Sequence, residues 1–156
     1  MVVLSPEDLI KLFGVDEEKV DCAGLKLTLD KVFRIVGVGR LSKNSKELPK
    51  YESVIDSNGL YRLPQGIYLV KYGEYIRIPN GYIGLAIQRS SLLRMGASLY
   101  TAVWDPGYEG KGSGLMVVHN PHGIIIERGT QIAQLVIIKM SSPTSKLYRG
   151  TYFKET

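Results

Sequence analysis

Three segments of the sequence combine residue types that can bind phosphate or activate water. The first, Arg89-Ser90-Ser91-Leu92-Leu93-Arg94, directly follows an apolar run. Two guanidinium groups and two hydroxyls at the end of a strand can donate hydrogen bonds to phosphate oxygens. If residues 92–95 form a helical turn, free backbone N–H groups add to this binding. A capped surface turn is the alternative interpretation.

The second segment, Ala102-Val103-Trp104-Asp105-Pro106-Gly107-Tyr108, carries a lone acid out of an apolar run into a Pro-Gly turn. Such an aspartate either bonds its own backbone within the turn or acts as a general base that deprotonates water. The residues alone leave both interpretations open. The glycines that follow are not a P-loop, because Lys111 is followed by Gly112 instead of Ser or Thr.

The third segment, Gly129-Thr130-Gln131-Ile132-Ala133-Gln134-Leu135, places two glutamines in an otherwise apolar strand. A glutamine that faces the core needs a hydrogen-bond partner, which a ligand could supply. A glutamine that faces solvent is the alternative for each position.

These segments must be positioned by a largely extended chain. A helix is predicted over residues 5–13, with Ser5 as N-cap, Pro6 in the first turn and Gly14 as the terminator. Alternation of Leu25, Leu27 and Leu29 with polar residues predicts a strand, and residues 32–36 a second one. Residues 37–59 are polar and glycine-punctuated, which predicts a long surface loop.

From residue 60 onward, short apolar runs alternate with turn signals such as 72–74 and 79–81. The predicted strands are 60–63, 67–72, 75–78, 82–87, 99–104, 115–119, 123–126 and 131–139. This spacing is typical of a β-sandwich, jelly roll or barrel. Residues 140–156 begin with a Ser/Pro/Thr hinge and are expected to form a separate tail.

Length and composition limit the classes of protein. The 156 residues predict a single domain. A net charge of +5 is consistent with an anionic partner and equally with a solvated basic surface. One cysteine excludes an internal disulfide and a Cys-based zinc site. With no apolar run of about 18 residues and no secretory signal, we expect a cytoplasmic protein without a membrane contact.

In order and spacing, the three segments together resemble the dUTP diphosphatase and dCTP deaminase superfamily, and most closely its archaeal dUTP diphosphatases. The resemblance extends from the N-terminal helix almost to the C-terminus. It implies a mainly β, jelly-roll-like distorted barrel with a short N-terminal helix. It also implies a homotrimer with active sites between subunits, dUTP as the partner, and no binding of nucleic acid.

The implied activity is Mg²⁺-dependent hydrolysis of dUTP to dUMP and pyrophosphate, with Mg²⁺ held by the triphosphate and no protein ligand to the metal. Asp105 would orient and deprotonate the water that attacks the α-phosphorus, and Tyr108 would pack against the deoxyribose and exclude a 2′-hydroxyl. Phosphate oxygens would be bound by Arg89, Ser90, Ser91 and Arg94, phosphate or sugar by Gln134, and uracil by the backbone of Ala102, Val103 and Trp104. Residues 140–156, with Tyr148 and Tyr152, would form a lid over the site.

Two other functions are weighed against this one. Deaminases of the superfamily carry a glutamate on the strand after the Gly-Tyr turn, but here Val117 takes that place and no acid occurs between Glu109 and Glu127. A dCTP deaminase or a bifunctional enzyme is therefore the second hypothesis. The third is a small β-barrel that binds single-stranded nucleic acid through basic and aromatic residues. Lys26 and Thr151 depart from the family pattern, which usually has Asp and Lys there.

Overall fold

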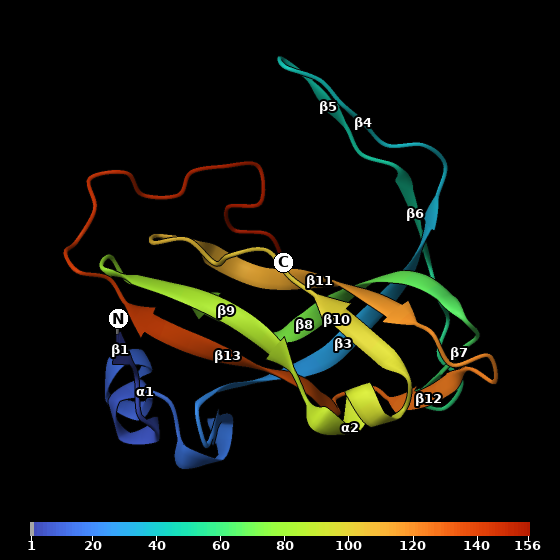
Figure 1. Ribbon diagram of the computed structural model, residues 1–156, viewed down its shortest axis with the longest axis horizontal. Helices are drawn as coiled ribbons and strands as arrows, with labels where there is room; N and C mark the ends of the chain where they lie inside the picture. Colours follow the sequence, from blue (N-terminus) through green and yellow to red (C-terminus); the bar gives the residue numbers. More distant parts are fainter. Residues whose placement is uncertain (1) are drawn as a thin grey trace.

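The computed structural model describes residues 2–156 and is mainly β (Figure 1). Its helical segments are short: α1 (Pro6–Phe13), the 3₁₀ turn η1 (Glu17–Lys19) and α2 (Ser90–Arg94). None of the helices in this described part of the chain has the length and apolar content needed to cross a membrane.

Thirteen strands are distributed along the chain. They are β1 (Val2–Val3), β2 (Val20–Asp21), β3 (Gly24–Val36), β4 (Arg40–Leu41), β5 (Lys46–Glu47), β6 (Lys50–Ser53), β7 (Leu60–Leu63), β8 (Gly66–Arg77), β9 (Tyr82–Gln88), β10 (Ala97–Tyr100), β11 (Glu109–Val118), β12 (Ile124–Glu127) and β13 (Gln131–Lys139). The predicted strands at 60–63, 82–87, 123–126 and 131–139 are confirmed to within a residue or two.

Most strands join one curled sheet in the order β1-β13-β3-β8-β11-β10, in which β2 and β6 also pair with β3, and β9 pairs with β13 (Figure 1). Two small sheets, β12-β7 and β4-β5, complete the pairing. Alternate residues of the long strands are buried and form the core, among them Leu27, Leu29, Val70, Leu135 and Ile137. Because this period-two alternation is visible in the sequence, the strands that build the core could be predicted.

The N-terminal helix is confirmed with its caps. The Ser5 hydroxyl accepts from the Asp8 backbone N–H at 3.2 Å, and Pro6 occupies the first turn. Gly14 ends the helix in the left-handed conformation, with φ of 61°. Leu9 on the inner face is fully buried, so this helix is anchored to the sheet by one apolar stripe.

Two predicted breaks are wrong. Strand β3 continues through residues 30–31, although its pairing with β8 shifts register there. Strand β8 likewise continues through the predicted turn at residues 72–74, where its pairing with β11 shifts register. A methyl group on Gly73 would lie 2.6 Å from the Thr28 hydroxyl oxygen, so the glycine permits close contact between β8 and β3. The Glu74 carboxylate then accepts from the backbone N–H and the hydroxyl of Thr28, at 2.8 and 2.7 Å.

The predicted loop over residues 37–59 is also wrong in part, because it contains β4, β5 and β6. Strands β4 and β5 form a two-stranded ribbon that projects from the body of the molecule (Figure 1). Every residue in these three strands is exposed. A ribbon that buries neither face has no period-two pattern, which is why the sequence did not reveal it.

Candidate active site

Asp105 lies on the wall of a cavity of about 460 Å³ that is lined by residues of β6, β8, β11, the Asp105 turn and the C-terminal segment, together with Leu48. Seven residues predicted for the site line it: Ala102, Val103, Trp104, Asp105, Tyr108, Tyr148 and Tyr152. The remaining lining residues are Leu48, Tyr51, Leu69, Gly112, Ser113 and Glu155. The cavity therefore combines one exposed acid with a wall that contains five aromatic residues.

The turn that presents Asp105 is closed by the backbone. The Tyr108 N–H donates to the Asp105 carbonyl oxygen at 3.0 Å, with Pro106 second and Gly107 third at φ of 81°. This is the arrangement of a type II turn, in which the third position requires a positive φ and so favours glycine. Within residues 2–156 the Asp105 carboxylate makes no hydrogen bond or ion pair, and it is exposed. It is therefore free to accept a proton from a bound water.

Four aromatic rings form a row from the core to the C-terminal segment. Ring centroids are 6.1 Å apart for Tyr72 and Trp104, 5.2 Å for Trp104 and Tyr108, and 5.6 Å for Tyr108 and Tyr148. Their planes are tilted or edge-on, which is the favoured geometry for aromatic pairs. Three of these rings, Trp104, Tyr108 and Tyr148, line the cavity and give it an apolar side suited to a nucleobase or sugar.

Trp104 is fixed between two strands. Its backbone N–H and C=O both bond to Gly84 of β9 at 2.9 Å, and its ring packs against Gly112 of β11. The glycines at 110, 112 and 114 alternate on the buried face of β11, which begins at Glu109, whereas the predicted strand began at residue 115. Gly112 and Gly114 make room for Trp104 and Tyr72.

The cavity is polar at two further points. Burial raises the pKa of Tyr108 to about 12, and the nearby Glu155 carboxylate adds to this effect, so the phenol stays neutral at physiological pH. The Ser113 hydroxyl is buried and has no hydrogen-bond partner among the described residues. A bound ligand could supply that partner.

Residues of the ribbon and the C-terminal segment meet over this cavity. Lys46 of β5 donates to the Thr151 hydroxyl at 2.6 Å, and its ammonium lies 5.1 Å from the centre of the Tyr152 ring. Sequence reasoning missed Leu48, Tyr51 and Ser113 as lining residues. No local signal identified them, because they become part of the site only through contacts between distant segments.

The phosphate-binding residues predicted from the sequence lie elsewhere. Residues 90–94 form the short helix α2, where the sequence left a helical turn at residues 92–95 open. Arg89, which is the N-cap of α2, and Ser90, Ser91 and Arg94 within it are all exposed. None of these four, nor Gln134 of β13, lines the Asp105 cavity. In Figure 1, α2 lies at the lower edge of the molecule and the C-terminal segment above β11. A single chain therefore carries two separate groups of predicted site residues.

Gln134 lies directly opposite Lys26 in the pairing of β13 with β3. In the described part of the chain its side-chain carbonyl oxygen is buried without a hydrogen-bond partner. Rotation of the amide can present either its oxygen or its nitrogen to a ligand. Gln131, in contrast, is already bonded to protein groups.

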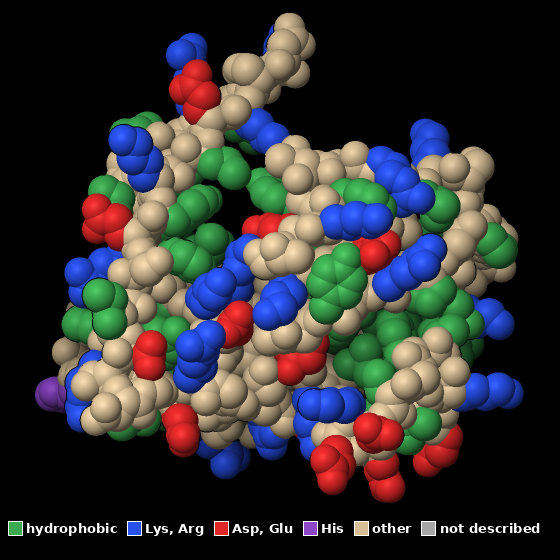
Figure 2. All heavy atoms as spheres, turned by 180° about the vertical axis from the view of Figure 1, so that it is seen from behind, with side chains coloured by type: hydrophobic (Ala, Val, Ile, Leu, Met, Phe, Trp, Pro, Cys, Tyr) green, Lys and Arg blue, Asp and Glu red, His purple; other side chains and the backbone are tan. Residues whose placement is uncertain are grey.

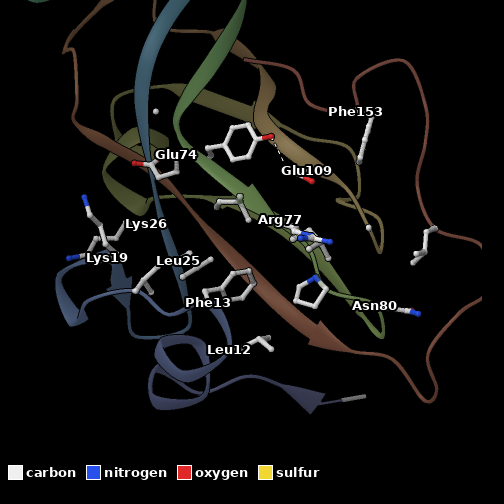
Figure 3. Close-up of a pocket in the computed structure, with 18 of the residues that line it drawn as sticks. Leu12, Phe13, Lys19, Leu25, Lys26, Glu74, Arg77, Asn80, Glu109 and Phe153 are labelled. Atoms are coloured by element: carbon white, nitrogen blue, oxygen red, sulfur yellow. Dashed lines mark hydrogen bonds between the residues drawn. The ribbon is translucent and has the colours of Figure 1, made fainter.

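A larger cavity of about 840 Å³ lies between α1, β8 and the C-terminal segment (Figure 3). Its lining includes none of the individually predicted catalytic or substrate-binding residues, although Leu147, Arg149 and Phe153 of the predicted lid segment belong to it. Its two carboxylates are engaged, Glu74 by Thr28 and Glu109 by the Tyr75 hydroxyl at 3.0 Å. We place the candidate active site in the smaller cavity, because only there does a carboxylate remain free beside an aromatic wall.

The surface charge is uneven. Figure 2 shows Lys and Arg side chains spread over the face seen from behind, while acidic side chains gather at the lower right edge. The first turns of α1 and η1 contribute Glu7, Asp8, Glu17 and Glu18 to the acidic residues of the chain. Among residues 2–156, no group of three or more His, Cys, Asp or Glu side chains is placed to hold a metal ion.

Two archaeal proteins are similar to this chain over nearly its whole length. A protein of Aeropyrum pernix named "Probable deoxyuridine 5'-triphosphate nucleotidohydrolase" is 38% identical over 152 residues, which is 96% of each chain. A protein of the same name from Archaeoglobus fulgidus is 41% identical over 163 residues, covering 97% of this chain and 96% of its own.

The fold is similar to a solved structure of a 2'-deoxycytidine 5'-triphosphate deaminase from Agrobacterium tumefaciens, with a TM-score of 0.66 and 18% identity. The match covers 86% of this chain and 48% of that longer one. A protein-family model described as "dCTP deaminase-like" matches residues 5–140 of the sequence. The chain therefore belongs to the dCTP deaminase-like family.

Proposed function

We propose that this protein hydrolyses dUTP to dUMP and pyrophosphate. The observation that carries the proposal is the unpartnered Asp105 carboxylate at the wall of an aromatic cavity. The names of the archaeal relatives, which match over nearly the whole chain, support the same substrate.

In the proposed reaction the nucleoside occupies the aromatic cavity, with the deoxyribose against Tyr108 and the uracil edge at the backbone of residues 102–104. Asp105 accepts a proton from a water whose oxygen forms a bond to the α-phosphorus. The bond from that phosphorus to the bridging oxygen breaks, and pyrophosphate leaves with the bonding electrons. The buried Ser113 hydroxyl is available to the nucleoside.

The active site is proposed to form between copies of the chain in a homotrimer. The lining of the Asp105 cavity includes two carboxylates, Asp105 and Glu155, but no Lys or Arg. A triphosphate needs positive charge and hydrogen-bond donors, which Arg89 and Arg94 of α2 offer at the surface. Large apolar side chains near both groups are exposed, including Ile87, Leu93 and Val103 at 50%, 61% and 49%. Burial of these side chains against a second copy would bring the two groups together.

Magnesium is assigned to the substrate in this proposal. Within residues 2–156, no group of three or more His, Cys, Asp or Glu side chains is placed to hold a metal ion. When Mg²⁺ is bound by the triphosphate, it supplies positive charge to the phosphate oxygens. No proton transfer or bond change in the proposed reaction depends on a metal ligand from this chain.

Deamination of dCTP is the competing activity, and it requires a proton shuttle at the base. The only other carboxylate in the cavity lining, Glu155, is paired with Lys71 at 3.1 Å. Position 117 on β11 is a valine. Neither side chain is available to shuttle the proton that loss of ammonia requires.

A nucleotide panel tests the proposal. With Mg²⁺ present, pyrophosphate and ammonia release would be measured for dUTP, dCTP, dTTP and UTP. We expect pyrophosphate from dUTP and no ammonia from dCTP. Release of ammonia from dCTP would overturn the assignment to the dUTP-hydrolysing members of the family. A complete lack of turnover with all four nucleotides would overturn the proposal that the protein is an enzyme. Sedimentation equilibrium on the same preparation tests the homotrimer, which a monomeric active enzyme would contradict.

A further inference from the structure

Arg89 lies where α2 meets β13, and its backbone is fixed on both sides. Its N–H donates to the Ile132 carbonyl oxygen at 2.9 Å, and its own carbonyl oxygen accepts from the Leu92 N–H at 3.1 Å. As the N-cap residue of α2, Arg89 has extended backbone angles of −72° and 148°. The position of the Arg89 backbone, from which the side chain extends, is therefore fixed by β13 and α2.

The Arg89 side chain is held by two further residues. Its Nη1 donates to Oε1 of Gln131, and Nε2 of Gln131 donates to Oδ2 of Asp21 at 3.0 Å. Asp21 in turn accepts from the Cys22 backbone N–H at 2.9 Å, and its Oδ2 lies 3.7 Å from Arg89 Nη1. A continuous chain of contacts thus runs from β2 through β13 to the guanidinium.

These contacts leave one edge of the guanidinium unused. Within residues 2–156, Nε and Nη2 of Arg89 make no hydrogen bond, and the side chain is 44% exposed. That edge has the paired donors with which arginine binds two oxygens of one phosphate. The anchored Nη1 sets the direction in which the free edge points.

The chain of contacts contributes little to stability. Exposed ion pairs are screened by water and often add nothing measurable to the free energy of unfolding. Orientation is a different effect, because a long side chain that is ordered before binding loses less conformational entropy when the ligand arrives. The hydrogen bond from Gln131 lowers the pKa of Asp21, so the carboxylate is ionised at neutral pH.

We propose that Gln131 and Asp21 are positioning residues, which hold Arg89 with its free edge directed at the phosphate groups of the substrate. The proposal rests on the proposed function for the identity of that substrate. Neither Gln131 nor Asp21 was given a role in the reaction from the sequence, and Asp21 lies outside the three segments from which the site was predicted.

Single variants test the proposal. Gln131→Leu and Asp21→Ala each interrupt the chain, and each should raise KM for dUTP about tenfold, equivalent to about 1.4 kcal/mol, with a smaller change in kcat. Thermal midpoints should stay at the wild-type value. Asp21→Asn keeps an acceptor oxygen for Gln131 and should raise KM no more than about threefold. Asp16→Asn is the matched control, since Asp16 is an exposed acid whose side chain caps nothing.

The double variant Arg89→Lys/Gln131→Leu separates positioning from a direct role. If Gln131 acts through Arg89, its removal adds nothing once the guanidinium is gone, so the double variant should match Arg89→Lys alone. A further tenfold rise in KM on top of Arg89→Lys would overturn the proposal. So would an unchanged KM in both Gln131→Leu and Asp21→Ala.

Binding of inorganic tripolyphosphate, measured by calorimetry, gives a readout that does not depend on turnover. Wild type should bind it, and Gln131→Leu and Asp21→Ala should each bind about tenfold more weakly. If that difference appears in a protein that does not hydrolyse dUTP, the proposed function fails while the positioning role stands. Equal binding by all variants, or none by wild type, would overturn the positioning role.

Discussion

Trp104 packs directly against Gly112: a methyl group at position 112 would lie 2.1 Å from Cζ2 of the indole. The ring can occupy this place only because β11 has no side chain there. Trp104 is the single tryptophan of the chain, so its fluorescence reports on the candidate active site alone.

Gly112→Ala should therefore displace the indole and disturb the cavity wall. Overpacking of this kind costs about 1–3 kcal/mol, and each kcal/mol lowers the thermal midpoint of a domain this size by about 2–4 °C. We expect a lower midpoint, a shifted tryptophan emission maximum and weaker nucleotide binding. Gly66→Ala in β8 is the control, because a methyl group there would meet only the Tyr68 ring at ordinary distances of 3.5–3.7 Å. Wild-type emission from Gly112→Ala would show that the strand shifts instead of the ring.

Asp105→Asn should remove the proposed general base while the turn stays folded, since the turn is closed by the backbone bond from Tyr108 to residue 105. We expect kcat for dUTP to fall by about 10²–10⁴, with nucleotide affinity close to wild type. Steady-state pyrophosphate release and calorimetric binding of dUMP measure the two effects. Turnover near wild type would mean that the water is activated by another group.

The elements that could be predicted from the sequence are those with a local cause. Ser5, Pro6 and Gly14 define α1 through caps that act within a few residues. Strand β13 was predicted with its correct bounds because an apolar run and its flanking turn residues are both local. The backbone turn at Asp105 likewise follows from Pro106 and Gly107.

The rest depends on contacts between distant segments. Gly73 was predicted to lie in a turn and Gly112 outside the predicted strands, yet neither has a positive φ. They are glycines because Thr28 and Trp104 occupy the space of a side chain. The same holds for the site. Ser113 becomes a candidate ligand contact only because its buried hydroxyl lacks a partner in the described structure. Such causes are not visible in a single sequence.

The raised pKa of Tyr108 predicts a loss of stability at high pH. Burial keeps this phenol protonated in the folded state up to about pH 12, whereas in the unfolded chain it ionises near pH 10. Between these values the unfolded state has lost a proton that the folded state retains, so stability falls as pH rises, by about 1.4 kcal/mol per pH unit for one tyrosine.

Tyr108→Phe should make that decline shallower, as measured by urea unfolding at a series of pH values from 9 to 12. Burial also raises the pKa of Tyr72, so Tyr72→Phe should reduce the slope independently, and the double variant should reduce it further. An identical slope in wild type and Tyr108→Phe would contradict the burial of the Tyr108 hydroxyl.

The C-terminal segment is proposed to act as a lid over the Asp105 cavity. It contacts the site through its backbone: the Tyr148 N–H donates to Pro106 at 2.8 Å, the Lys154 N–H to Glu109 at 2.7 Å, and the Lys111 N–H to Glu155 at 2.8 Å. Its side chains Tyr148 and Tyr152 complete the cavity wall. The segment thus both supports the Asp105 turn and closes the cavity.

Deletion of residues 146–156 should affect both properties. Loss of the backbone bonds should lower the thermal midpoint of the nucleotide-free protein, and loss of the aromatic cover should reduce kcat/KM for dUTP by more than about tenfold. The double variant Tyr148→Ala/Tyr152→Ala keeps the backbone bonds, so it should retain most of the stability and still lose most of the activity. If the truncated protein is destabilised but the double variant hydrolyses dUTP normally, the segment is a docked edge of the sheet and closes no site. Circular dichroism melting and initial rates on the same three proteins distinguish these results, because a lid and an edge strand predict opposite outcomes for the double variant.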